Sequence, residues 1–211
     1  MVKFIYHRNN RQVFTEETVM VGIYDCFGYG ESYDVPFEER YSLIKQAGFD
    51  CVMLWWSDKF GRGRGYQEDV RLAKKAGLEI DNMHTPVHGQ NCLSSDNLDM
   101  VLNTFQSKFA GYCYDSCHHQ NYAPDIDLLN KYGNRLMALH LHDNGGKNNQ
   151  HQLPFDGNID WRDVMKKITL TGYQGATTLE PMNWDYEDLS IQKFLDCAYQ
   201  KAKLLNDMRD L

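Results

Sequence analysis

The stretch LMALHLHDN at positions 136–144 places two histidines directly behind a run of apolar residues. Successive side chains of a β-strand point to opposite faces, so His140 and His142 would share one face while Leu139 and Leu141 share the other. Both imidazoles would then lie at the carboxyl end of a strand, where ligands and catalytic groups gather in β/α barrels and doubly wound sheets. The stretch indicates a metal site, although a hydrogen-bonded histidine pair at the edge of a core fits this pattern equally well.

Apolar runs alternate with helical patterns along the rest of the chain. Five further strands are predicted at 19–24, 49–56, 78–84, 110–114 and 175–180, and helices at 36–47, 66–76, 97–106, 125–132 and 189–207, with another starting at Asp160. Glycine closes several of these helices, which is typical of parallel strands joined by helical crossovers. The sequence therefore predicts an α/β fold built as an incomplete β/α barrel of about six units, where a closed barrel has eight.

The regular pattern is interrupted at two places. Residues 1–17 are polar and irregular apart from 2–6, and we predict an N-terminal extension with an edge strand or hairpin. Residues 87–96 are predicted as polar loop, and the helix at 97–106 has no strand before it. An open barrel exposes two strand edges, which proteins usually cover, so we expect a homodimer or another cover across the gap near 87–97.

Composition limits the class of protein. The 211 residues are 42% hydrophobic and 24% charged, which is the profile of one soluble globular domain spanning 1–211. The net charge of −7 leaves no broad basic surface, so nucleic-acid binding is disfavoured. No apolar run approaches the ~18 residues of a membrane span and the N-terminus lacks a signal peptide pattern, so we expect a cytoplasmic protein. The six cysteines are expected as free thiols, mostly buried.

Polar and aromatic side chains stand at the predicted carboxyl end of each strand. They are Tyr24 and Asp25, Trp55 and Trp56, His84, Asp115 with His118, His140 with His142, and Glu180. Aspartate, histidine and glutamate together supply nitrogen and oxygen ligands suited to one divalent ion such as Mn²⁺, Zn²⁺, Co²⁺ or Mg²⁺. A metal with open positions can hold two neighbouring oxygens of a sugar and stabilise an enediolate while a carboxylate moves the proton.

Four segments, 112–119, 139–144, 151–161 and 172–180, resemble the xylose isomerase-like TIM barrel superfamily. That group includes sugar phosphate isomerases and epimerases and the endonuclease IV family, also called AP endonuclease family 2. The resemblance extends over roughly residues 18–207. It implies that Asp115, His140 and Glu180 bind the metal, with His142 as the competing ligand to His140. It also implies that His118 contacts substrate or a second metal.

Two departures from the family pattern bear on activity. The family has a further metal-binding glutamate at the end of the strand before Asp-x-x-His, and this chain has only the polar stretch near 87–97 there, with Asp96 as a nearby carboxylate. We therefore expect an internal deletion of about two β/α units. Endonuclease IV also needs a histidine from the absent segment, and Asn149-Gln-His151 stands where that family has Asp-x-His. Both losses disfavour DNA repair.

These features predict a metal-dependent isomerase or epimerase of a small-molecule sugar or sugar phosphate, acting by proton transfer next to a carbonyl. Glu180 and His118 are the predicted catalytic residues, and the predicted substrate contacts are His84, His142, His151 and Trp55. Two alternatives stay open: a catalytically silent family remnant that keeps a sugar pocket, and an endonuclease IV-like phosphodiesterase.

Each candidate also has a plain structural interpretation. Asp115 would cap a following helix, and Glu180 would be a surface carboxylate at a strand end. His84 would be a hydrogen-bonded residue at the rim, and His151 an exposed loop histidine. Trp55 and Trp184 fit packing or a pocket wall better than chemistry.

Overall fold

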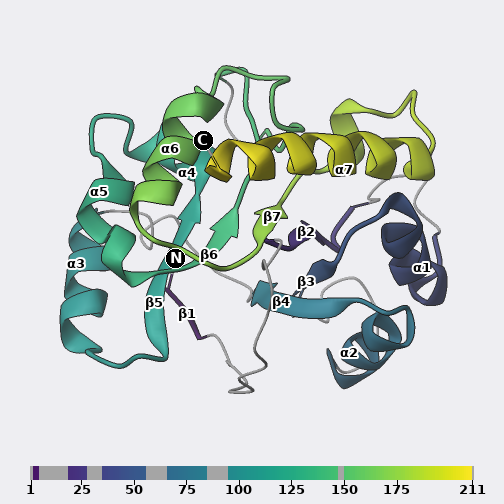
Figure 1. The fold of residues 1–211 in the computed structure, drawn as a ribbon, viewed down its shortest axis with the longest axis horizontal. Coiled ribbons are helices and arrows are strands. Elements are labelled where there is room, and N and C mark those ends of the chain that lie inside the picture. The colour runs from purple at the N-terminus through teal and green to yellow at the C-terminus, as the bar shows by residue number, and fades with distance from the viewer. Residues whose placement is uncertain are drawn as a thin grey trace.

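A curved, largely parallel sheet forms the centre of the molecule (Figure 1). The computed structural model describes residues 2–4, 19–27, 35–55, 66–84, 95–146 and 150–210. Four parallel strands follow the order β4-β3-β2-β7: β2 is Val21–Tyr24, β3 Cys51–Trp55, β4 Glu79–His84 and β7 Thr177–Leu179. Strands β5 (Ala110–Asp115) and β6 (Leu136–His140) are also parallel, and a bridge between Leu141 and Leu179 continues the sheet from β6 to β7.

Helices surround this sheet on its outer side (Figure 1). They are α1 (Phe37–Ala47), α2 (Tyr66–Lys75), α3 (Ser95–Thr104), α4 (Ser116–Tyr122), α5 (Leu128–Tyr132), α6 (Trp161–Leu170) and α7 (Ile191–Asp207), with short 3-10 turns η2 (Gly133–Arg135), η3 (Asn183–Asp185) and η4 (Met208–Asp210). The apolar stripe of α7 is buried against β2, β7 and α1, which confirms its predicted role as a covering helix. No helix in the described ranges has both the length and the apolarity needed to cross a membrane.

The predicted incomplete barrel is confirmed: six strands of the described chain run parallel to one another, with three on each side of the interruption in sequence. Several predicted boundaries differ by two or three residues from those of the structure, and two of them are the starts of helices. The predicted helix at 125–132 begins only at Leu128, because the Asp127 side chain caps it by accepting from the Asn130 N–H. The predicted loop at 87–96 ends earlier, since α3 already includes Ser95 and Asp96. Residues 85–94 lie outside the described part, as do Trp56 and Asn149.

The N-terminal edge strand was predicted and is present in the described residues as β1 (Val2–Phe4). It pairs antiparallel with β5, with Val2 opposite Tyr112 and Phe4 opposite Ala110. One of the two strand edges beside the interruption is therefore covered by the chain itself. Within the described ranges β4 pairs with β3 alone, so the other edge has no strand on it.

Candidate metal centre

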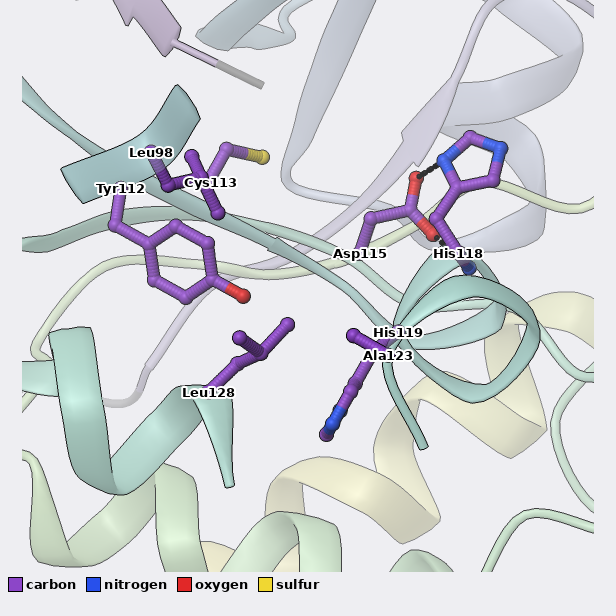
Figure 2. Close-up of a pocket in the computed structure, with 8 residues that line it drawn as sticks. All are labelled: Leu98, Tyr112, Cys113, Asp115, His118, His119, Ala123 and Leu128. Carbon is purple, nitrogen blue, oxygen red and sulfur yellow. Dashed lines mark hydrogen bonds and ion pairs between the residues drawn. The ribbon is translucent and has the colours of Figure 1, made fainter. Parts of the chain in front are cut away.

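Asp115 is the last residue of β5 and the N-cap residue of α4, and its carboxylate contacts both the helix and neighbouring histidines. Oδ1 accepts a hydrogen bond from the backbone N–H of His118 at 2.9 Å, which caps α4. The same oxygen lies 3.0 Å from His142 Nε2, and Oδ2 lies 2.7 Å from His118 Nδ1 (Figure 2). Asp115 is only 7% exposed. The helix-cap interpretation is thus correct, and the same side chain also contacts two histidines.

Glu180 follows β7 and points into the same region. Its backbone N–H donates to the Leu141 carbonyl at 2.9 Å, which fixes the position of Glu180 relative to the residues that follow β6. Oε2 lies 2.5 Å from His140 Nδ1, and Oε1 lies 3.5 Å from His84 Nε2. Glu180 is only 2% exposed, so the alternative interpretation of this residue as a surface carboxylate is wrong.

Two overlapping groups of side chains could hold a metal ion in the described part of the chain. One consists of Asp115, His142 and Glu180, and the other of His84, His140 and Glu180; within each, the ligand atoms lie within 4.8 Å of one another. The structure therefore brings Glu180 together with both histidines of the 136–144 stretch. Asp115 shares its group with His142, the competing ligand, whereas His140 belongs to the other group.

The buried carboxylates fit a cation. Asp115 Oδ2 and Glu180 Oε2 are buried and make no hydrogen bond of ordinary geometry with any described residue, although ring nitrogens lie close to both. A buried carboxylate oxygen without a directed donor is costly. Carboxylate oxygens and imidazole nitrogens that converge in this way are the ligands that a divalent ion takes.

The ionisation of these groups follows from their contacts. Burial raises the pKa of Asp115, but His118 and His142 lower it more, so the net pKa lies well below the ordinary value. Burial likewise raises the pKa of Glu180, and His140 and His84 lower it well below the ordinary value. For His142, burial lowers the pKa while Asp115 raises it, and the net pKa lies well above the ordinary value. For His118, burial likewise lowers the pKa while Asp115 raises it, and the net pKa lies above the ordinary value. Imidazole protons on His118 and His142 therefore balance the Asp115 carboxylate when no cation is bound.

His151 forms a wall of the site from the loop between β6 and α6. Its ring stacks on His142 with centroids 4.0 Å apart and planes 8° apart, and its Nδ1 lies 3.1 Å from the Glu180 carbonyl. Burial, followed by the charge of His142, lowers the pKa of His151 to about 4. Trp184 meets His151 edge-on with centroids 5.6 Å apart and is 40% exposed. The exposed-loop interpretation of His151 is therefore wrong.

The opposite wall comes from β2, β3 and β4. The His84 ring stacks against Tyr24 and against His140, with centroids 5.5 Å apart in both cases. Trp55 lies behind Tyr24 at a centroid distance of 6.2 Å. Asp25 is buried and belongs to neither metal-capable group; its carboxylate accepts from the Trp55 N–H and the Tyr41 hydroxyl. Asp96 is exposed on α3 and is likewise in neither group.

A small pocket lies beside β5 on the side of α3, α4 and α5 (Figure 2). Asp115 and His118 form one end of its lining and the remaining walls are mainly apolar: Leu98, Tyr112, Cys113, His119, Ala123 and Leu128. Figure 2 also shows that the second ring nitrogen of His118 points away from Asp115.

Sequence reasoning missed two supporting residues. Asn82 Oδ1 lies 3.4 Å from His140 Nε2. Its signal was present, because Asn82 and His84 are two positions apart on β4 and so share a face. Asp143 is fully buried and accepts from the backbone N–H groups of Asn144, Phe155 and Ile159 and from Trp161 Nε1. It holds the loop that carries His151, and nothing local to Asp143 identifies its partners.

Comparison with known families agrees with this architecture. The sequence profile described as "Xylose isomerase-like TIM barrel" matches residues 75–195, which is more than half of the chain. The chain belongs to the xylose isomerase-like TIM barrel family. The matched region of this family member includes all residues of both metal-capable groups.

Individual relatives cover smaller parts. An uncharacterized protein, y4fM, from Sinorhizobium fredii is 37% identical over 110 residues, which are 51% of this chain and 35% of that protein. Fructoselysine 3-epimerase from Shigella flexneri is 33% identical over 57 residues, 27% of this chain and 21% of that enzyme. This family member therefore spans less than half the length of the curated relatives that it matches.

Among solved structures, D-psicose 3-epimerase from Clostridium cellulolyticum H10, crystallised with D-tagatose, superimposes with a TM-score of 0.61 at 14% identity. The superposition covers 90% of this chain and 99% of that one. At this identity the likeness establishes the shared fold.

Proposed function

We propose that this protein is a metal-dependent isomerase or epimerase of a sugar or sugar phosphate. The observation that carries the proposal is the convergence of Asp115, His142 and Glu180 at the carboxyl ends of three neighbouring strands, with buried carboxylate oxygens that lack directed donors. Membership of the family supports it, as does the similarity to fructoselysine 3-epimerase.

The residues of the site suit proton transfer next to a carbonyl. When bound by Asp115, His142 and Glu180, a divalent ion supplies Lewis-acid polarisation of a carbonyl oxygen. Glu180 then acts as the base that removes a proton from the neighbouring carbon. His118, whose Nδ1 contacts Asp115 and whose other ring nitrogen points away, returns a proton. Trp184 and His151 shield one side of the site from water.

Which group returns the proton, Glu180 or His118, decides whether the sugar is isomerised or epimerised. If Glu180 returns the proton to the former carbonyl carbon, and the hydroxyl proton passes between the two neighbouring oxygens, a ketose is converted to an aldose. If His118 instead donates a proton to the original carbon from the opposite face while Glu180 keeps the one it removed, the carbonyl stays in place and the configuration at that carbon is inverted. His118 lies on α4 and Glu180 directly follows β7, so the two side chains come from different elements and both reactions belong in the assay.

Deuterium exchange tests the proposal. The protein is loaded with Mn²⁺ and incubated in D2O with a panel of ketoses and ketose phosphates, and NMR follows both C–H exchange and new sugars. We expect exchange in the wild type and a loss of at least ~100-fold in Glu180→Gln, the usual scale for removing a general base. Glu187→Gln is the matched control, because Glu187 is exposed and in neither group. Equal exchange in wild type and Glu180→Gln would refute the role of Glu180.

A catalytically silent remnant is the second candidate. It is favoured because neither metal-capable group of the described residues contains a second glutamate. A silent remnant would bind a sugar, detected by line broadening or calorimetry, without exchanging any of its C–H positions. An endonuclease IV-like activity would instead show as nicking of an abasic duplex.

A further inference from the structure

We propose that Asp81 is a positioning residue for Glu180. It acts through Asn82, which fixes the ring nitrogen of His140 that carries a hydrogen. This inference rests on the proposed function, in which Glu180 is the base. Asp81 lies on β4 and belongs to neither metal-capable group. A continuous series of side-chain contacts joins it to the segments that follow β6 and β7.

An irregularity in β4 gives Asp81 its place. Consecutive residues of a regular strand point to opposite faces. Here Ile80 lies opposite Val52 and Asn82 lies opposite Met53, so Asp81 is an extra residue between two paired positions. Such bulges redirect side chains and are frequent next to active sites. The bulge lets two neighbouring polar side chains, Asp81 and Asn82, face the inner side of the sheet.

Asp81 contacts β7 across the inner side of the sheet. Its Oδ2 accepts a hydrogen bond from Thr178 Oγ1 at 2.6 Å, although β3 and β2 separate β4 from β7 in the strand order. Thr178 is fully buried and lies two positions before Glu180, so both side chains point to the same face. The contact therefore ties β4 to the strand that Glu180 follows.

The same carboxylate sets the orientation of the Asn82 amide. Asn82 Nδ2 lies 2.7 Å from Asp81 Oδ2, and Asn82 Oδ1 lies 3.4 Å from His140 Nε2. A carboxylate only accepts hydrogen bonds, so the amide nitrogen has to face Asp81 and the amide oxygen faces His140. An amide oxygen also only accepts, so His140 Nε2 has to carry the hydrogen. Asp81 thus decides the hydrogen position on a histidine of another strand.

His140 transmits this orientation to Glu180. Its ring is fully buried, and with Nε2 directed to Asn82, Nδ1 faces Glu180 Oε2 at 2.5 Å. Because Thr178 and Glu180 belong to one segment, the contacts form a closed ring that begins and ends at β7. A base has to be held accurately, since a displacement of about 1 Å can lower a rate by about 100-fold. The ring supplies this accuracy from outside the metal-capable groups.

Histidine NMR and substrate hydrogen exchange together test the role of Asp81. The ¹⁵N resonance of His140 Nε2, assigned with His140→Gln, reports whether this nitrogen carries a hydrogen in the metal-free protein. We expect a hydrogen on Nε2 in the wild type. Asp81→Ala should shift the resonance toward that of a bare nitrogen. In the Mn²⁺-loaded protein the same variant should lower kcat for C–H exchange by about 10–100-fold, the scale for losing such supporting contacts.

Two further variants separate positioning from a general loss of charge or of fold. Asp81→Asn should behave as the wild type in both measurements, because its amide oxygen can still accept from Thr178 and Asn82. Glu79→Ala is the matched control, since Glu79 is an exposed carboxylate on the same strand, and both readouts should stay unchanged. If Asp81→Ala does not fold, Asn82→Leu carries the test, because it removes the acceptor of His140 Nε2 and keeps the contact between Asp81 and Thr178.

The outcomes distinguish this inference from the proposed function. An Nε2 resonance that is unchanged in Asp81→Ala and in Asn82→Leu would overturn the role of Asp81. A lower free energy of unfolding in Asp81→Ala, with resonance and exchange as in the wild type, would also overturn it. A wild type that exchanges no substrate hydrogen would overturn the proposed function and the effect on Glu180, while the resonance would still decide whether Asp81 orients His140.

Discussion

Asp143 shows how one side chain can organise a wall of the site. Asp143 is fully buried, and its carboxylate accepts from four donors of the 144–161 segment at 2.7–3.1 Å. This segment brings His151 over His142.

Asp143→Asn should therefore destabilise the fold. The amide would turn an N–H group toward donors that lose their acceptor, and we expect a loss of about 3 kcal/mol in the free energy of unfolding, measured by urea titration. Asp156→Asn is the control from the same loop: Asp156 pairs at the surface with Lys201 and Tyr186, and its loss should cost less than ~1 kcal/mol. Equal losses in the two variants would contradict this role for Asp143.

The pKa of His142 predicts proton release on metal binding. Asp115 raises this pKa above the ordinary value, against the effect of burial, so the cation-free protein holds a proton on His142 near neutral pH. A metal needs the lone pair that this proton occupies, so binding must expel it. Apparent Mn²⁺ affinity should rise with pH up to the raised pKa and level off above it. Calorimetry in two buffers of different ionisation enthalpy measures the released proton; a buffer-independent enthalpy would contradict His142 as a ligand.

At the level of elements, the close approach of β5 to β6 sets the distance between Asp115 and His142. Gly111 permits this approach, since a Cβ at this position would lie 2.6 Å from the Arg135 carbonyl oxygen. Arg135 precedes β6, and a backbone atom cannot rotate away as a side chain can.

Gly111→Ala should push these strands apart. We expect a loss of about 2 kcal/mol in the free energy of unfolding and weaker Mn²⁺ binding, measured by urea titration and dialysis. Gly145→Ala is the control, because its nearest neighbours are glutamine side-chain oxygens at 3.5 and 3.8 Å. A fully stable Gly111→Ala would show that β5 and β6 adjust without strain.

At the level of the whole molecule, the described chain leaves the outer edge of β4 without a partner strand and exposes apolar side chains between α3 and β5. β1 covers β5, whereas β4 pairs only with β3 within the described residues. Phe105 and Phe109, between α3 and β5, are 49% and 52% exposed. Exposed edges and apolar groups together favour association.

The expected homodimer is tested by sedimentation velocity. We expect a dimer in the wild type and at least a tenfold weaker dimer when Phe105 and Phe109 are both replaced by Glu, since burial of aromatic groups dominates such interfaces. Leu170→Glu is the control, because Leu170 is 77% exposed at the end of α6 and does not belong to the segment between α3 and β5. A monomer in the wild type would contradict the dimer.

Local sequence determined the elements of this protein and most of its candidate ligands. Period-two and helical apolar patterns with glycine at helix ends identified six strands, and the polar residues behind those strands included Asp115, His142 and Glu180. These features depend on neighbours along the chain. The limits of the loops were less well predicted, because a capping side chain such as Asp127 moves a helix boundary without changing the pattern of apolar residues.

Only the tertiary structure decided how those residues combine. The 136–144 stretch alone could not divide its histidines between two groups, since that depends on which strands lie beside β6 and at what height. Asn82 contacts His140, which lies 58 positions later in the sequence, and β1 pairs with β5, more than a hundred positions away. Strand order, register and sheet curvature set such distances, and they are properties of the packed sheet that no local pattern contains.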